Sequence, residues 1–236
     1  MMLPKLKLIS FTFVFIFSLS RIILAEDIRK RFSDGETLSY KVYFNAVPSG
    51  TVTWHYQGRE NVGGKVADVL RISSDTSILK FLSLESDERI FLDSQSHLPL
   101  QVERDVVFSG KRELIKEVYN QDDGSVRIVR KHDKEVNEEV FKCDKPIHNI
   151  LALLYFFPKD FELIFKKWYY FNLPTQKVKI QPVSLRSIKR LGIDKECYFI
   201  IGRGAKRFSL WLDKETRIPL RLEFIVPVGK ITIVRI

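Results

Sequence analysis

The chain has 236 residues, with 39 Lys and Arg against 29 Asp and Glu, and a formal net charge of +10. Two cysteines exclude a disulfide-dense scaffold, and four histidines leave few side chains for a metal site. Hydrophobic residues make up 45% of the chain, enough to build one sizeable core.

Residues 1–25 predict a secretory signal peptide. Lys5 and Lys7 give a basic start, residues 8–19 form an apolar run, and Ala25 offers a cleavage site. The alternative is an uncleaved N-terminal anchor, although Arg21 interrupts the run and a spanning helix needs about 20 apolar residues. No cysteine lies near the cleavage point, so lipid attachment there is excluded. The sequence therefore predicts a periplasmic or secreted protein in which residues 26–236 form a single all-β domain.

Removal of residues 1–25 would lower the net charge to +7. Such an excess favours peripheral contact with anionic lipid, lipopolysaccharide or peptidoglycan, or it serves solubility alone. Nucleic acid is not expected as a partner, because export separates the protein from it and no basic-aromatic recognition motif is evident.

The first half of the domain predicts strands joined by hairpins. Apolar and polar side chains alternate with period two over residues 38–44 and 52–56, and residues 66–72 give a third strand. Gly-containing turns separate these runs. Residues 77–84 are apolar but lose the alternation, so a short helical or irregular crossover is expected there. Further strands follow to residue 129, and the charged residues 130–139 are expected at a solvated hairpin end.

One buried helix is predicted over residues 146–157. Asp144 can cap it, Pro146 suits its first turn and Pro158 ends it. The segment is apolar nearly all round, which is typical of a helix that crosses the concave face of a curved sheet or plugs one end of it.

Strands are expected again over residues 168–173, 178–188, 198–201, 208–212 and 231–234. The whole pattern predicts a mainly β fold: a large curved antiparallel sheet, open or partly closed like a barrel, with one buried helix.

One stretch occurs twice, at residues 91–103 and 211–223. Both copies place an aromatic residue, Leu and Asp before a polar turn, and Pro-Leu-x-[Val/Leu]-Glu after it. Asp93 and Asp213 can accept hydrogen bonds from the backbone two residues on, and Pro99 and Pro219 suit the start of a strand. The repeat predicts two equivalent β-hairpins, which mark architecture and not chemistry.

No catalytic residue, metal site or cofactor is predicted, because the sequence lacks His-x-x-x-His, Cys-x-x-Cys and Gly-x-Ser-x-Gly motifs. Cys143 and Cys197 either form a disulfide, which an oxidising compartment permits, or stay as two buried free thiols. Glu103 and Glu223 occupy equivalent places in the two copies, and we expect them in charge pairs on strand faces.

The chain resembles the family of exported bacterial proteins called domain of unknown function 3108, from Phe32 to the C-terminus. The resemblance rests on Phe32-Ser-Asp-Gly-Glu-Thr-Leu-Ser-Tyr40, Gly50, Asp93 with Leu98-Pro-Leu100, Ile150-Leu-Ala-Leu-Leu-Tyr155, Trp211-Leu-Asp213, Ile218-Pro-Leu220 and Gly229. The turn before Cys197 is shorter than is usual in that family. The chain is similar, more distantly, to periplasmic lipoprotein carriers, whose curved sheets hold acyl chains; the nearer resemblance implies no established activity.

These observations predict an envelope protein, more readily non-enzymatic than enzymatic, that binds a lipid or other apolar ligand in the concave face of the sheet. The alternative is a partner-binding or scaffolding domain with a filled core, and an envelope hydrolase that uses strand carboxylates ranks third. The candidate ligand-lining residues are Trp54, Phe81, Leu154, Phe157 and Trp211.

Overall fold

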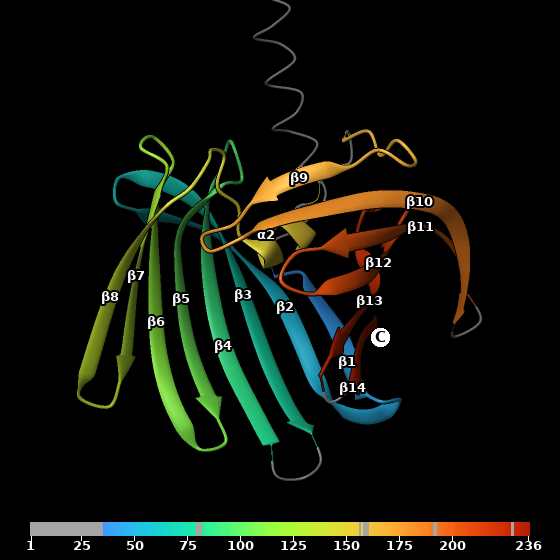
Figure 1. Cartoon of the computed structure of the whole chain (residues 1–236), viewed down its shortest axis with the longest axis horizontal. Coiled ribbons are helices and arrows are strands. Elements are labelled where there is room, and N and C mark those ends of the chain that lie inside the picture. The colour runs from blue at the N-terminus through green and yellow to red at the C-terminus, as the bar shows by residue number, and fades with distance from the viewer. Residues whose placement is uncertain (1–34, 79–81, 156, 158–160, 191–192, 228) are drawn as a thin grey trace, which may run out of the picture.

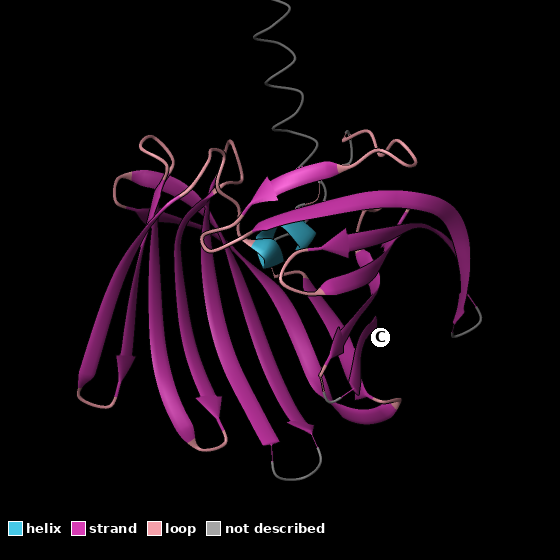
Figure 2. Cartoon of the chain, viewed as in Figure 1, coloured by secondary structure: helices cyan, strands magenta, loops and turns pink. Residues whose placement is uncertain are grey.

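The structure is a computed structural model that describes residues 35–236 apart from 79–81, 156, 158–160, 191–192 and 228. In this part of the chain, fourteen strands form one antiparallel sheet with the order β8-β7-β6-β5-β4-β3-β2-β1-β14-β13-β12-β11-β10-β9. One short helix, α2 (Ile150–Tyr155), lies against the sheet (Figure 1, Figure 2). The predicted fold class is confirmed. The predicted signal peptide, residues 1–25, lies outside the described residues.

The first eight strands are β1 (Thr37–Phe44), β2 (Val47–Val62), β3 (Lys65–Ile78), β4 (Leu82–Asp93), β5 (Pro99–Phe108), β6 (Lys111–Asn120), β7 (Ser125–His132) and β8 (Glu135–Lys142). The other six are β9 (Tyr169–Asn172), β10 (Lys177–Arg190), β11 (Ile193–Arg203), β12 (Arg207–Asp213), β13 (Pro219–Val226) and β14 (Gly229–Arg235). Every strand pairs with its neighbours in sequence except at β8 and β9, and β1 pairs with β14. The sheet is therefore open, with β8 and β9 as its edges.

The sheet curls around α2, which sits near one end of the long strands β2–β7 (Figure 1). We call the face that carries α2 and the main core the inner face, and the opposite face the outer face. Because side chains alternate along a strand, the strands turn every second residue toward the inner face. Among the described residues, no helix is long and apolar enough to cross a membrane.

The main core runs through both halves of the sheet. Its fully buried members include Leu38, Leu70, Ile90, Leu92, Val102, Val126, Ile147, Tyr155, Ile200, Leu210 and Leu212. Since these residues come from β1, β3, β4, β5, β7, β11, β12 and the helix region, one continuous core joins the two halves of the sheet.

The repeated stretch forms two β-hairpins with the same geometry, as predicted. Asp93 Oδ1 accepts a hydrogen bond of 2.8 Å from Ser96 N, and Asp213 Oδ1 accepts one of 2.8 Å from Thr216 N. The fourth residue after each aspartate has a positive φ, 55° in the first copy and 58° in the second. The β-bulge before each turn also recurs. The local sequence was therefore sufficient to specify these turns.

Two predictions about segments are wrong. Residues 77–78 continue β3 and residues 82–84 begin β4, and the two strands pair as a hairpin, so these residues do not form a crossover. Residues 79–81 lie outside the described residues. The helix begins at Ile150 and not at Pro146, because Asn149 is its cap: Asn149 Oδ1 accepts hydrogen bonds from Leu151 N at 2.9 Å and Ala152 N at 3.1 Å. Asp144 instead pairs with a lysine of β10.

Candidate functional site

The inner face next to α2 contains three of the five predicted ligand-lining residues. Trp54, Leu154 and Phe157 are all buried in the main core, and the Trp54 ring lies 5.7 Å from the ring of Tyr155 on the helix. Side chains of α2 and of the sheet therefore pack against one another here.

The structure does not bring Trp211 to this cluster. Its neighbours along β12, Leu210 and Leu212, are buried on the inner face, so Trp211 points to the outer face. There its ring lies 4.9 Å from the ring of Phe199. Phe81, the fifth predicted residue, lies outside the described residues.

A buried polar cluster marks the border of the packed core. It consists of Glu88, Arg104, Glu117 and Tyr119, from β4, β5 and β6, and we call it the Glu88 cluster. Arg104 Nε lies 2.8 Å from Glu88 Oε2, and Arg104 Nη1 lies 2.7 Å from Glu117 Oε1. The Tyr119 hydroxyl donates to Glu117 Oε2 at 2.5 Å. Two carboxylates thus share one guanidinium, as buried charges require partners.

The other oxygen of Glu88, Oε1, is buried without a hydrogen bond of good geometry, and the side-chain amide of Asn149 lies beside it. Burial raises the pKa of Glu88, and the Arg104 guanidinium opposes that shift. Burial alone would lower the pKa of Arg104, but Glu88 and Glu117 together raise it. Because Asn149 also caps α2, the Glu88 cluster and the helix start share one residue.

On the side of the Glu88 cluster that is away from α2, the side chains of the inner face are smaller or more exposed. Ser74 and Ser86 bond to each other through their hydroxyls at 2.7 Å, and Val106 lies opposite Ser86 on the next strand. Leu84 and Phe108 pair across β4 and β5 and are 37% and 52% exposed, although both project from the inner face. We call these five residues the inner strip. It has apolar and hydroxyl character and is less buried than the packed core.

Residues 143–149 run from the end of β8 to the start of α2, and we call this segment the clasp. Ile147 N donates to Gln121 Oε1 at 3.0 Å, and Gln121 Nε2 donates to Ile147 O at 2.8 Å. His148 N donates to Asn172 O of β9 at 2.7 Å. The clasp therefore lies between the β6–β7 turn and β9, with one isolated parallel bridge from Ile147 to Asn172.

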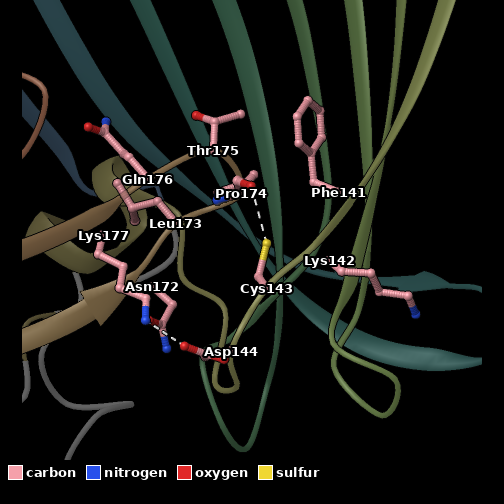
Figure 3. Close-up of a pocket in the computed structure, with 10 residues that line it drawn as sticks. All are labelled: Phe141, Lys142, Cys143, Asp144, Asn172, Leu173, Pro174, Thr175, Gln176 and Lys177. Carbon is pink, nitrogen blue, oxygen red and sulfur yellow. Dashed lines mark hydrogen bonds and ion pairs between the residues drawn. The ribbon is translucent and has the colours of Figure 1, made fainter.

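Next to the clasp, a pocket of ≈ 450 Å³ lies between the end of β8 and the β9–β10 turn (Figure 3). Cys143 Sγ donates a hydrogen bond of 3.1 Å to Pro174 O inside it, and Lys177 Nζ lies 2.5 Å from Asp144 Oδ2. Phe141 and Leu173 supply its apolar lining.

Both cysteines are free thiols in the structure, so of the two alternatives left by the sequence it has the thiols and not the disulfide. Cys197 Sγ donates to Arg186 O at 3.0 Å. Burial raises the pKa of Cys143, and burial with Asp213 nearby raises the pKa of Cys197 to about 11. Raised pKa values keep both thiols protonated, which is the opposite of what a cysteine nucleophile needs.

The two equivalent glutamates both lie in charge pairs on the outer face. Glu103 Oε1 lies 3.5 Å from Lys116 Nζ, and Glu223 Oε2 lies 2.8 Å from Lys230 Nζ. Glu223 also pairs with Arg221. Ordinary ion pairs therefore engage both residues.

The Glu88 cluster was not predicted as a site, although the sequence carries a signal for it. In β6, Ile115, Glu117 and Tyr119 follow the strand period, so the glutamate shares its face with two buried residues. A charged residue in phase with core residues indicates a buried polar partner on another strand. Finding that partner required the register of β4 against β5 and of β5 against β6.

Comparisons with known proteins show the fold of the chain but not its family or its function. No family model and no curated protein sequence matches the chain, so the likeness to domain of unknown function 3108 stays a resemblance. The chain is similar to the crystal structure of a beta-barrel-like protein of domain of unknown function DUF1849 from Brucella abortus, with 8% identity, 85% of this chain and 94% of that chain covered, and a TM-score of 0.55.

Two other solved structures align over 86% of this chain and 94% of theirs. They are described as a "putative lipoprotein" from Parabacteroides distasonis (9% identity, TM-score 0.30) and a "putative exported protein with YmcC-like fold" from Bacteroides fragilis (7% identity, TM-score 0.31). These TM-scores are too low to support an argument. The protein therefore shares its open, barrel-like antiparallel fold with the Brucella abortus protein, and its function has to be inferred from its own inner and outer faces.

Proposed function

We propose that this protein is exported to the cell envelope and binds an amphiphile on the inner strip, without catalysing a reaction on it. The ligand would have an apolar chain and a polar end that donates a hydrogen bond. Export is supported by the signal-like pattern of residues 1–25. A non-enzymatic role is consistent with the two protonated thiols and with the ion pairs of Glu103 and Glu223.

The observation that carries the proposal is the change along the inner face. Under α2 the core is filled, but two residues beyond Glu88 and Arg104 the side chains become small or partly exposed. Leu84 and Phe108 expose apolar surface toward the inside of the curled sheet, where an acyl chain would cover it. Covering apolar surface stabilises a complex by roughly 25 cal/mol per Å².

Glu88 gives this strip a polar end. Its Oε1 is buried beside the Asn149 amide without a good hydrogen bond, so a ligand hydroxyl, amide or ammonium that displaced this amide would satisfy it. Arg104 is ion-paired with both Glu88 and Glu117, so the Glu88 carboxylate is held in a fixed position before the ligand binds. An apolar strip that ends at one fixed acceptor suits an amphiphile better than a wholly apolar molecule.

Native mass spectrometry of the protein recovered from expressing cells without detergent tests the proposal. We expect a bound mass that organic extraction removes and that is identified as an amphiphile. Val106→Trp, which fills the inner strip, should abolish the bound mass, whereas Val107→Trp at the adjacent outer-face position should keep it. An apo mass that stays unchanged when lipids are added back contradicts the proposal.

The second candidate function is partner binding at the β8 edge. Seven of its eight residues are exposed, all but Phe141, and Val136 and Val140 are 64% and 61% exposed. A free strand edge of this kind can accept a strand from another protein. A copurifying protein that is lost from Val140→Asp and kept by Val106→Trp would favour this function over the first.

A further inference from the structure

The positive charge of the chain is concentrated in one part of the sheet. Residues 163–213, which include β9–β12, carry eleven Lys and Arg against three Asp and Glu. Residues 37–142, which include β1–β8, carry fifteen Lys and Arg against seventeen Asp and Glu. Most of the net charge of +10 therefore comes from about a fifth of the sequence, and composition alone does not reveal this.

Strand register brings these cations together on the outer face. Lys179 lies opposite Tyr170 on one side and opposite Arg203 on the other, and Arg203 lies opposite Arg207. The alternate residues of β10, such as Val178, are buried on the inner face. One row across β9, β10, β11 and β12 thus presents one tyrosine and three cations to solvent.

Aromatic rings accompany these cations. The ring of Trp168 lies 4.8 Å from Lys179 Nζ and 5.5 Å from Arg203 Cζ, and Arg186 Cζ lies 3.6 Å from the ring of Phe199. A cation over a ring keeps its full charge, whereas a carboxylate partner would neutralise it. Among the described residues, none of these cations has an ion-pair partner, and the same holds for Arg207.

We call this surface the basic-aromatic face and define it by Trp168, Tyr170, Lys179, Arg186, Arg203 and Arg207. A groove of ≈ 340 Å³ borders it, between Arg203 and Arg207 on one side and Lys230 on the other. Its floor includes Ile201, and Ile225 at its rim is 71% exposed. The one carboxylate in the groove, Glu223, is already paired with Arg221 and Lys230.

We propose that the basic-aromatic face docks the protein on the surface of an anionic lipid bilayer. Arg203 and Arg207 would contact lipid phosphates, Trp168 and Tyr170 would lie at the headgroup level, and Ile225 would enter the boundary with the acyl chains. This role is separate from the amphiphile proposed for the inner strip, because it uses the other face of the sheet.

The chemistry favours a bilayer over other polyanions. Trp and Tyr have an apolar body and a polar tip, which suits the boundary between water and lipid. Exposed aliphatic surface such as Ile225 gains from contact with acyl chains and gains nothing from a polysaccharide or from stacked bases. The anionic surface potential supplies the matching charge, and each Lys or Arg near it strengthens binding by roughly fivefold.

Vesicle flotation tests the proposal with the protein recovered without detergent. We expect binding to vesicles of phosphatidylglycerol and phosphatidylcholine, and no binding to vesicles of phosphatidylcholine alone. Replacement of Lys179, Arg203 and Arg207 by Gln together should weaken binding on the order of 100-fold, the product of three such residues. Raised salt should weaken binding by the wild type, because the charges are exposed.

The matched control replaces three cations by Gln in the part of the sheet formed by β1–β8, which we call the β1–β8 arm; β9–β12 form the β9–β12 arm. The three cations are Arg112, Arg127 and Lys142. These three residues are exposed, and their replacement removes the same total charge, but each of them has a carboxylate partner. This variant should bind within about threefold of the wild type. Equal losses in the two triple variants would overturn the proposal, since net charge and not this face would then decide binding. Urea denaturation confirms that both variants are folded.

Two further outcomes would also overturn it. Equal binding to neutral and anionic vesicles would mean that charge plays no part. Tighter binding to a single-stranded oligonucleotide than to anionic vesicles, lost in the Lys179, Arg203 and Arg207 variant, would assign the face to nucleic acid. Weaker binding to the oligonucleotide than to the vesicles supports the membrane.

Discussion

The two arms of the sheet use their positive charges in different ways. In the β1–β8 arm, cations meet carboxylates across strands: Arg59 pairs with Asp68, and Arg104 pairs with Glu88 and Glu117. In the β9–β12 arm, cations lie over rings, as Lys179 and Arg203 do over Trp168. One sheet thus carries a neutralised surface and a charged one.

The difference shows what each arm is adapted to. Cross-strand ion pairs fix strand register and leave little net charge. Cations over rings are held in place but stay available to an outside anion. The first arm therefore uses its charges largely in ion pairs within the sheet, and the second leaves several cations without a carboxylate partner among the described residues, as the proposed membrane face requires.

The largest expected effect separates the inner face from the outer face. Trp54→Ala should lower the free energy of unfolding by about 3–5 kcal/mol, because it removes a buried ring from the core beneath α2. Trp211→Ala, on the outer face of the other arm, should cost about 1 kcal/mol, since its ring is half-buried against Phe199. Urea denaturation measures both. Equal losses would show that Trp211 belongs to a core after all.

A second pair of variants tests the different use of cations directly. Arg104→Met should destabilise the protein by about 3–5 kcal/mol, because it leaves Glu88 and Glu117 buried without a counter-charge. Arg203→Met should change the free energy of unfolding by less than about 0.5 kcal/mol, since it removes no ion pair. Its effect should instead be on vesicle binding. A stability loss from Arg203→Met that matched the loss from Arg104→Met would remove the distinction between the arms.

The two hairpin copies provide a finer comparison. Asp213 is 2% exposed and Asp93 is partly exposed, although both accept the same backbone hydrogen bonds. We expect Asp213→Ala to cost about 2 kcal/mol and Asp93→Ala about 1 kcal/mol, because unsatisfied N–H groups cost more when buried. Thermal or urea unfolding of the two variants decides whether burial or turn geometry sets the cost. The reverse order would make turn geometry dominant.

The smallest effect is a dependence on pH with opposite signs at two sites. Burial raises the pKa of Glu88, so the folded state holds its proton at a higher pH than the unfolded state does, and this group costs stability as the pH rises through that window. The stability of Glu88→Gln relative to the wild type should therefore increase as the pH rises from 4 to 7.

Asp105 is the matched site on the outer face. The hydrogen bond from Arg112 lowers the pKa of Asp105, so the stability that this pair contributes is lost as the pH falls. Asp105→Asn should therefore become less stable relative to the wild type as the pH rises through the acidic range up to about 4, below the window for Glu88. If the free energy of unfolding relative to the wild type changed with pH in the same direction for both variants, the assignment of Glu88 to a buried environment would be contradicted.

How much could be read from the sequence depended on how local each feature is. The Asp93 and Asp213 turns were predicted because their bonding partners lie within three residues. The start of the helix was misplaced because residues 147–148 pair with Gln121 and with β9, contacts that no local pattern reveals. Trp211 could have been assigned to the outer face from its buried leucine neighbours in β12.

The two faces of interest depend on register. Glu88 meets Arg104, and Lys179 meets Arg203, only because neighbouring strands align at those residues. A shift of one residue in either pair would turn one member to the other face. Alternation along each strand predicts which residues share a face, but which residues become neighbours across strands has to come from the structure.

The pairing of β1 with β14 has a consequence for how the protein is made. Strand β1 leaves the ribosome first among the described strands, and its second neighbour, β14, emerges after all the others. Until then the two halves of the sheet are separate hairpin chains with exposed edges at the future centre. A chain that stopped before Gly229 would leave β1 and β13 without their shared neighbour. Premature termination there would yield two unjoined half-sheets, prone to pairing with other chains, and not a slightly shorter protein.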